Sequence, residues 1–366
     1  MASNQNIRSN SSAEKVLVAM GSGADSMVVA WLLKKQGKNM RGVYFDMLND
    51  PERNEWVRQQ EKKMGFPIQI INVKAETEEK LKPLFIAAKL AGERVSLRGL
   101  FQRVIMFPKL FELRAQHNFD KVSTGHSVQL QFDQVEQVAR VYKALDSIQD
   151  ESRMLLGVHQ NWLKYLELPL GSIPGSMVSR ISEEMQLSFL SPMRDHIIWS
   201  EMEEQFLTAL PSHVKAEFEV FSFRGERMGN FNDPWSMQPG DEYENQEAQK
   251  SEVVQTEPYF IWRIDTGSGR FIVGQIQDRE LGFFKMKEAT WFSMPGLRMA
   301  GLKRHMTWWN CPQPIPVKAL EFEGGKLKVI VDEKLKGQDA GIYPGNTVLF
   351  LRGDEVLGGA EVASCE

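Results

Sequence analysis

The sequence predicts an α/β protein that begins with a parallel β-sheet and ends with a small β-barrel. In the first half of the chain, short β-rich runs alternate with helical patterns, as is typical of a parallel sheet covered on both faces. In the last third the hydrophobic period changes to two, and glycine-rich turns separate short strands. With 366 residues, 42% of them hydrophobic, the chain is long enough for two or three domains.

The first half alternates four strands with helices. The expected strands are Val16–Met20, Met40–Met47, Pro67–Val73 and Lys121–His126. The expected helices are Asp25–Gln36, Glu52–Met64, Glu76–Ala91 and Phe101–His117. Glycines at 37 and 65 end the first two helices, because glycine readily adopts the left-handed conformation of that position. Ligands of such sheets bind beyond the carboxyl ends of the strands, so the turns after the first, second and fourth strands are expected at one edge.

The second half is less regular before it becomes β-rich. A helical pattern continues from about Arg153 to Leu187, and a charged, methionine-rich region with a polar connector follows to about residue 255. Three hairpins are then expected over Tyr259–Gln275, Pro314–Glu333 and Asn346–Val362. We therefore expect a disordered leader (1–13), a nucleotide-binding sheet domain (14–190), a central domain with an insertion and the connector (191–255), and a barrel (256–366).

Composition excludes several classes of protein. The net charge of −4 gives no global reason to expect nucleic-acid binding, although a local basic face is left open. The two cysteines, Cys311 and Cys365, are too few for a disulfide framework and lack metal-ligand spacing, so no metal site is expected. The amino terminus has no apolar signal-peptide core, and no apolar run reaches membrane-spanning length. A cytoplasmic protein without a membrane partner is expected.

The turn "GSGADS", Gly21 to Ser26, is a candidate phosphate site. A helix amino terminus offers N–H groups and a partial positive charge, and glycines let the backbone approach an anion closely. Gly21, Ser22 and Gly23 are expected to surround phosphate oxygens, with the Ser26 hydroxyl and Asp25 beside them. The lysine of a P-loop is absent. Glycines that serve only a tight turn are an equally frequent explanation of such a pattern.

This turn resembles the Ser-Gly-Gly-x-Asp-Ser loop of the ATP pyrophosphatases, which adenylate a substrate and release pyrophosphate. From Lys15 to Val362 the chain more closely resembles the tRNA-specific 2-thiouridylases. The shared stretches are "KKMGFPIQIINV", "STGH", "LDSIQDES", "FSFRGER", "QPGD" and "VLGGAEV". The resemblance implies a PP-loop ATPase domain of the adenine nucleotide alpha hydrolase type, a small central domain and a carboxyl-terminal β-barrel.

The resemblance also implies a nucleotide site, with ATP as cofactor and Mg²⁺ left open as its companion. The implied nucleotide-binding residues are Met20, Gly21, Ser22, Gly23, Asp25, Ser26, Phe45, Gly125 and His126. Asp150 and Ser152 would lie near the substrate base. Plainer explanations stay open: His126 as an ordinary turn residue, Phe45 as a strand residue, and Asp146 and Asp150 as helix caps.

The sequence departs from this family where the sulfur chemistry is expected. The resemblance implies two cysteines, one that carries a persulfide and one that resolves the disulfide, because thiolates are nucleophilic and form reversible S–S bonds. Aligned without gaps, the first falls on Phe101 and the second on Ser222, while Arg98 stands at an aspartate of the family motif. About 30 extra residues precede Glu219. Neither phenylalanine nor serine forms a persulfide.

Two functions follow from this combination. The first is a thiouridylase-like protein that binds ATP or AMP and RNA, tRNA or another, and adenylates a substrate with release of pyrophosphate, while a protein partner supplies the nucleophile. The second is a non-catalytic nucleotide- or RNA-binding pseudoenzyme that acts through partners. Two basic stretches are candidate RNA contacts or solvated faces: the set Arg94, Arg98, Arg103, Lys109 and Arg114, and the segment Leu297–Trp309.

Overall fold

The computed structural model describes residues 13–185, 192–211, 214, 216–244, 257–292, 305–308, 311, 313–323 and 326–365. Residues 1–12 of the expected leader lie outside these ranges, as do most of the polar connector and most of the segment 297–309. In the described part of the chain, no helix has the length and apolar character needed to cross a bilayer.

The first sheet is parallel throughout, which confirms the predicted class. Its order is β3-β2-β1-β4-β7, made of β3 (Ile68–Asn72), β2 (Asn39–Asp46), β1 (Lys15–Met20), β4 (Lys121–Ser123) and β7 (Leu166–Glu167). Alternate residues of β1 enter two different cores: Leu17 and Ala19 pack on one face, and Val16, Val18 and Met20 on the other. Both faces are therefore covered, as hydrophobic runs of this kind require.

Two helical layers cover the sheet. They comprise α1 (Ala24–Lys35), α2 (Pro51–Met64), α3 (Lys74–Glu76), α4 (Lys82–Leu90), α5 (Leu97–Phe101) and α6 (Phe107–Gln116). The π-helical turns η1 (Thr77–Leu81) and η2 (Gln102–Met106) precede α4 and α6, whose second residues are prolines. Proline lacks an N–H and its ring clashes with the carbonyl four residues back, so a wider turn before it relieves the clash.

The expected helical stretch 153–187 is largely wrong. It contains η3 (Ser152–Leu155), α7 (Gln160–Leu163), the strand β7, η4 (Pro169–Ser172) and α8 (Gly175–Glu184). Gly157 adopts a left-handed φ of 94°, and Pro169 and Pro174 interrupt the pattern, so no continuous helix forms. The hairpin of β5 (Gln129–Asp133) and β6 (Val138–Tyr142) was not predicted.

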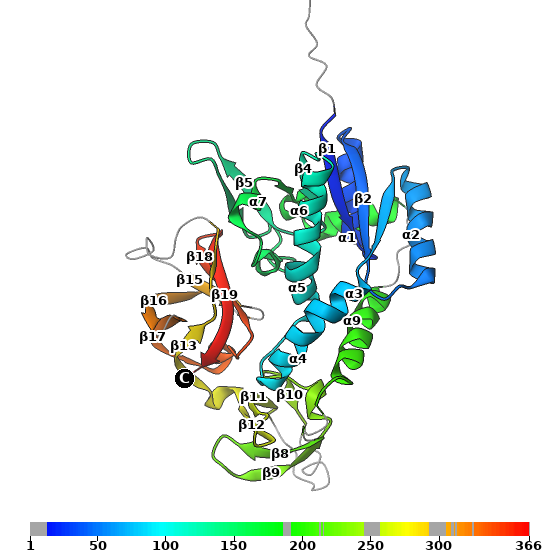
Figure 1. Cartoon of the computed structure of the whole chain (residues 1–366). Helices are drawn as coiled ribbons and strands as arrows, with labels where there is room; N and C mark the ends of the chain where they lie inside the picture. Colours follow the sequence, from blue (N-terminus) through cyan, green and yellow to red (C-terminus); the bar gives the residue numbers. More distant parts are fainter. Residues whose placement is uncertain are drawn as a thin grey trace, which may run out of the picture.

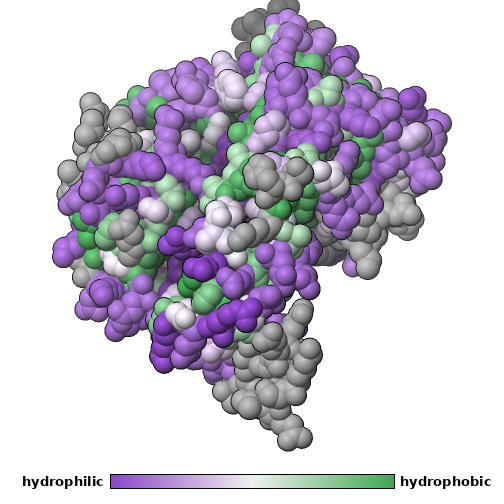
Figure 2. All heavy atoms as spheres, turned by 60° about the horizontal axis from the view of Figure 1, so that its bottom comes forward, coloured by the Kyte–Doolittle hydropathy of each residue, from purple (hydrophilic) through white to green (hydrophobic). Residues whose placement is uncertain are grey.

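The second sheet has the order β10-β11-β12-β8-β9. Its strands are β8 (Glu217–Ser222), β9 (Arg227–Asn232), β10 (Glu242–Tyr243), β11 (Tyr259–Asp265) and β12 (Arg270–Gln275), with η5 (Pro234–Ser236) beside them. The hairpin β11–β12 forms as expected, but it joins this sheet rather than the barrel, because β12 pairs with β8 and β11 with β10. The end of the molecule that carries this sheet is largely hydrophilic (Figure 2).

The carboxyl-terminal barrel closes through six strands in the order β13-β17-β16-β15-β18-β19, with β19 returning to β13. The strands are β13 (Glu280–Met286), β15 (His305–Trp308), β16 (Ile315–Glu323), β17 (Lys326–Lys336), β18 (Thr347–Arg352) and β19 (Glu355–Cys365). β14 (Thr290–Trp291) pairs with β19, while η7 (Ile276–Asp278) and η9 (Gly337–Ala340) cap the barrel. Both hairpins predicted here, β16–β17 and β18–β19, are confirmed.

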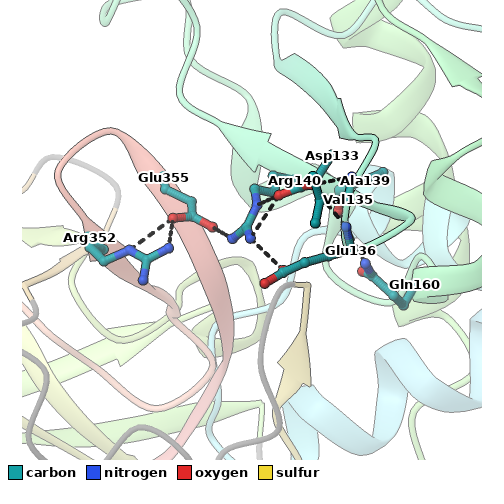
Figure 3. A network of polar contacts seen from close by, with 8 residues as sticks. All are labelled: Asp133, Val135, Glu136, Ala139, Arg140, Gln160, Arg352 and Glu355. Carbon is teal, nitrogen blue, oxygen red and sulfur yellow. Dashed lines mark hydrogen bonds and ion pairs between the residues drawn. The ribbon is translucent and has the colours of Figure 1, made fainter.

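A polar network joins the first domain to the barrel where β6 pairs with β19. Glu355, only 6% exposed, lies between Arg140 of β6 and Arg352 of β18 and accepts hydrogen bonds from both (Figure 3). Arg140 also binds Asp133 at 3.1 Å and Glu136 at 2.6 Å within its own hairpin. The buried carboxylate is satisfied from two sides, so the hairpin and the barrel are held in one register.

A helix from the extra residues bridges the first domain and the second sheet. α9 (Pro192–Leu207) runs beside α4 (Figure 1), and Phe206 meets Phe85 edge to face with ring centroids 6.0 Å apart. Both rings belong to the core that covers one face of the first sheet. The insertion is therefore an integral part of the wall above that sheet.

Candidate functional site

A cavity of about 760 Å³ opens at the carboxyl edge of the first sheet. The turn after β1, the end of β2, the loop after β4, the α5–η2 segment and α9 contribute its walls. Its lining includes all nine predicted nucleotide-binding residues: Met20, Gly21, Ser22, Gly23, Asp25, Ser26, Phe45, Gly125 and His126. Strand ends that are far apart in sequence meet here because the strands are parallel.

The glycine turn is held closed by one hydroxyl. Ser26 Oγ accepts a hydrogen bond from Gly21 N at 3.0 Å and lies 3.3 Å from the carbonyl oxygen of Gly21. Ser26 is 7% exposed, so its hydroxyl shapes the turn from the inside. In the described structure no side chain caps the first turn of α1, whose N-cap is Gly23. The partial positive charge of the helix therefore faces the cavity.

Two glycines of this wall differ in the space around them. A Cβ on Gly125 would lie 3.0 Å from both Asp25 Cβ and Ser26 N, so the loop after β4 packs tightly on the first turn of α1. A Cβ on Gly23 would meet nothing within 4 Å. Gly23 therefore leaves open space at the helix amino terminus, where an anion fits and a side chain would fill the cradle.

His126 is a buried, neutral imidazole in the cavity wall. Its Nδ1 shares a hydrogen bond of 2.7 Å with Thr124 Oγ1, and its ring stacks on Phe107. Burial, together with the smaller effects of the Arg98 and Arg153 charges, lowers the pKa of His126 to about 3. Its Nε2 has no hydrogen-bond partner among the described residues. A buried polar atom in a cavity wall is a position at which a ligand gains a hydrogen bond.

Phe101 lies in an aromatic group on the opposite wall. Its ring meets Phe45 edge to face at 6.1 Å, and Trp199 of α9 lies 5.7 Å away on a tilted plane. Phe101 is 6% exposed. At the place where the resemblance led us to expect a cysteine, the chain carries a ring that packs against the insertion.

Arg98 and Glu151 bring charge to this side of the cavity. Their closest atoms, Arg98 Nη2 and Glu151 Oε1, are 3.9 Å apart. Burial raises the pKa of Asp25, and the nearby Glu151 raises it further, whereas Arg98 lowers it. The three side chains therefore act on one another across the cavity. Glu151 was missed by the sequence reasoning, although it stands inside the "LDSIQDES" stretch.

Gln102 is a second residue that the sequence reasoning missed. It belongs to the π-turn η2, lines the cavity and is 6% exposed. Its Oε1 has no hydrogen-bond partner in the described structure. π-turns often occur at functional sites because they rotate side chains out of helical register. Pro108, two residues after the end of the turn, was the available sequence signal.

Three predicted residues are not part of the cavity lining. Asp150 Oδ1 accepts hydrogen bonds from Ala144 N at 2.8 Å and from Ser152 Oγ at 2.6 Å, so this pair stabilises its own turn. Ser222 belongs to β8 in the second sheet, and its Oγ accepts from Glu226 N at 3.1 Å. Phe101, in α5 and in the core over the first sheet, and Ser222, in β8 of the second sheet, therefore belong to different parts of the fold.

The "QPGD" stretch supports the segment that carries Arg98. Gln238 Oε1 accepts from Val95 N at 3.1 Å, and Asp241 Oδ1 pairs with Arg94 Nη1 at 3.1 Å. Arg94 also donates to the carbonyl oxygen of Pro239 at 2.7 Å. The segment that leads into the second sheet thus fixes the start of α5. It influences the cavity by holding the helix that carries Arg98 in place.

The predicted basic set is dispersed rather than gathered into one face. Most members have internal partners: Arg94 with Asp241, Arg103 with Glu361 at 2.8 Å, Lys109 with Glu76 at 2.7 Å, and Arg114 over the ring of Tyr165. Of the second basic stretch, only 305–308 is described. Within the described residues, no three His, Cys, Asp or Glu side chains gather in a way that would hold a metal ion.

The parallel sheet with its glycine turn and the closed barrel define an α/β protein of the PP-loop ATPase class. The family model described as tRNA methyl transferase HUP domain matches residues 14–195. The tRNA-specific 2-thiouridylase MnmA of Exiguobacterium sibiricum is 24% identical over 361 residues, covering 95% of this chain and 93% of that protein. That of Lactococcus lactis subsp. cremoris is 24% identical over 359 residues, covering 95% and 94%. The chain belongs to the tRNA-specific 2-thiouridylase family.

Among solved structures, the NH3-dependent NAD synthetase of Campylobacter jejuni matches with a TM-score of 0.32 at 17% identity. The match covers 56% of this chain and 81% of that protein. A likeness this distant adds nothing to the assignment.

Proposed function

We propose that this protein binds ATP in the cavity, acts on RNA, with tRNA as the first candidate, and transfers AMP to its substrate with release of pyrophosphate. The observation that carries the proposal is the open cradle at Gly23, which faces a helix amino terminus at the carboxyl edge of a parallel sheet. The relatives' names supply the substrate class, tRNA. The expected cytoplasmic location goes with this proposal.

The residues of the cavity have distinct roles in this reaction. N–H groups of Gly23 and of the first turn of α1 bind phosphate oxygens, while the hydrogen bond from Gly21 N to Ser26 Oγ keeps the turn closed. Phe45 lies beside the adenine. A substrate oxygen attacks the α-phosphorus, the bond to the β-phosphate oxygen breaks, and pyrophosphate leaves from the turn. Asp25, a carboxylate of the cavity lining in the first turn of α1, is the residue that would hold a Mg²⁺ ion accompanying ATP.

Persulfide chemistry is absent from this proposal. Phe101 and Ser222 offer no thiol, and the two cysteines of the chain, Cys311 and Cys365, pack against the barrel core. Burial raises the pKa of both thiols, that of Cys365 to about 12, so neither supplies a thiolate near neutral pH. The nucleophile that then attacks the adenylated substrate and displaces AMP comes from a partner.

A non-catalytic nucleotide- or RNA-binding role is the second candidate function. It is favoured by the aromatic group of Phe45, Phe101 and Trp199, which packs where the family reaction would place its sulfur donor. In that case the bound nucleotide stabilises one conformation of the cavity wall that contains Phe101 and Trp199, and partner molecules bind to that conformation.

Pyrophosphate release separates the two candidates. The purified chain is incubated with ATP, a sulfur donor and pools of RNA, and both pyrophosphate and 2-thiouridine are measured, the latter by mass spectrometry of nucleosides. RNA-dependent pyrophosphate without 2-thiouridine supports the adenylating enzyme. Silence in both readouts, with ATP bound, supports the non-catalytic role. Robust 2-thiouridine formation would contradict our interpretation of Phe101 and Ser222.

A further inference from the structure

Arg98 is the only lysine or arginine among the described residues that line the cavity. It shares the cavity with three carboxyl groups, those of Asp25, Glu151 and Glu203. It is the second residue of α5, a short helix capped by the Ser96 side chain, which accepts from Gly99 N at 3.1 Å. A nucleotide triphosphate therefore enters a site with one side-chain cation and several anions.

The guanidinium of Arg98 is loosely held, whereas its partner is fixed. Glu151 Oε2 accepts from Ser127 N at 3.2 Å, and the backbone of Glu151 is tied to the carbonyl oxygen of Ser127 at 3.1 Å. Arg98 approaches the other oxygen of Glu151 only to 3.9 Å, and its side chain is 49% exposed. An ion pair this long and exposed contributes little, so the guanidinium is free to exchange partners.

Arg98 also acts on the helix that carries the glycine turn. Its charge lowers the pKa of Asp25, in the first turn of α1, and of His126, in the loop that packs on that turn. The guanidinium therefore lines the same cavity as the first turn of α1 and lies within electrostatic reach of it. Arginine suits this role because its planar fork binds two phosphate oxygens at once.

We propose that Arg98 binds the phosphates of the nucleotide and supplies the side-chain cation that the lysine-free glycine turn lacks. The inference rests on the proposed nucleotide site and names a specificity-determining residue within it. On binding, the guanidinium exchanges Glu151 for phosphate oxygens. Glu151 competes for Arg98 in the empty cavity and lowers the affinity for the anion.

The test compares binding of ATP, AMP and adenosine by calorimetry to the wild-type chain and to R98Q, R98K, E151Q and R180Q. Loss of a charge-assisted contact predicts that R98Q weakens ATP binding roughly 10- to 100-fold and leaves adenosine within about twofold. R98K retains part of the ATP affinity, because its charge remains. E151Q strengthens ATP binding a few-fold, opposite in sign to R98Q. R180Q removes the same charge on α8, 65% exposed, and changes nothing.

Each outcome decides the inference. Equal ATP affinity of R98Q and wild type overturns it and leaves the nucleotide site standing, provided that Gly23→Val abolishes binding. An equal loss for ATP and adenosine also overturns it, since that result indicates a packing role. If the wild-type chain binds no ATP, the proposed function fails together with the inference. Thermal melting identifies any unfolded variant, and R98K then carries the comparison.

Discussion

The two walls of the cavity are built in different ways. The wall of the glycine turn, Met20 to Ser26 with Thr124 to His126, comes from strand ends and uses backbone groups and small side chains. The opposite wall, Ser96 to Met106 with Trp199, comes from α5, the π-turn η2 and the inserted helix α9, and it uses large rings and one guanidinium. The resemblance predicts that the first wall follows the family pattern and that the second departs from it.

This difference shows where divergence is tolerated in the fold. The glycine-turn wall is tied to the register of β1 and β4, and Gly125 leaves no space for a side chain against Asp25. The opposite wall is closed by side chains that repack with one another, so a ring at position 101 is accommodated once Trp199 provides a partner. We therefore expect nucleotide binding to depend on the first wall together with Arg98, and stability to depend on the rings of the second wall.

The largest expected effect on ligand binding is the loss of ATP binding in Gly23→Val. The side chain fills the cradle, and the phosphates lose their N–H contacts, so affinity falls roughly 100-fold or more, about 2.7 kcal/mol. Because no atom lies within 4 Å of the new Cβ, the cost to stability stays near that of a poorer N-cap, about 1 kcal/mol. Calorimetry and thermal melting measure both. Gly267→Val, in the β11–β12 turn, is the control and should bind ATP normally. Undiminished binding by Gly23→Val would remove the phosphate-turn assignment.

The next effect concerns the aromatic wall. Phe101→Ala deletes a buried ring and should lower the free energy of unfolding by about 3 kcal/mol. Trp199→Ala should be coupled to it by about 1 kcal/mol in a double-mutant cycle measured by urea unfolding, since the two rings are in contact. Trp291, which stacks on Phe350 in the barrel, is the control and should show no coupling with Phe101. If Phe101→Ala abolished ATP binding while the chain stayed folded, the division between the walls would be wrong.

The smallest effect is a pH dependence that originates in the first wall. The pKa of His126 is about 3 in the folded chain, against 6.5 for an ordinary histidine. Below pH 6.5 the unfolded chain binds a proton that the folded chain does not, so the free energy of unfolding falls as the pH decreases, by about 2 kcal/mol at pH 5. His126→Asn should flatten the slope between pH 6.5 and 4 in urea titrations. An unchanged slope would mean that His126 is not buried in its neutral form.

Local pattern was sufficient wherever one segment decided its own structure. The strands Val16–Met20 and Met40–Met47, and the two hairpins of the barrel, have periodicities that a single stretch displays. Prediction failed where a strand forms, or joins a sheet, only because a distant strand of the chain pairs with it. β7 has two residues and exists only because β4 pairs with it, and the hairpin β11–β12 joins the second sheet because β8 is there to receive it.

The sequence by itself determined the parallel sheet and the glycine turn at its edge, because each depends on residue types along one stretch, and the replacement of the expected cysteines by Phe101 and Ser222 stays a prediction from the resemblance. Only the tertiary structure decided that Glu151, Gln102 and Trp199 share a cavity with that turn, and that Asp150, Ser152 and Ser222 do not. The physical reason is that a cavity wall is defined by which side chains meet across elements, and that depends on packing between segments far apart in the chain.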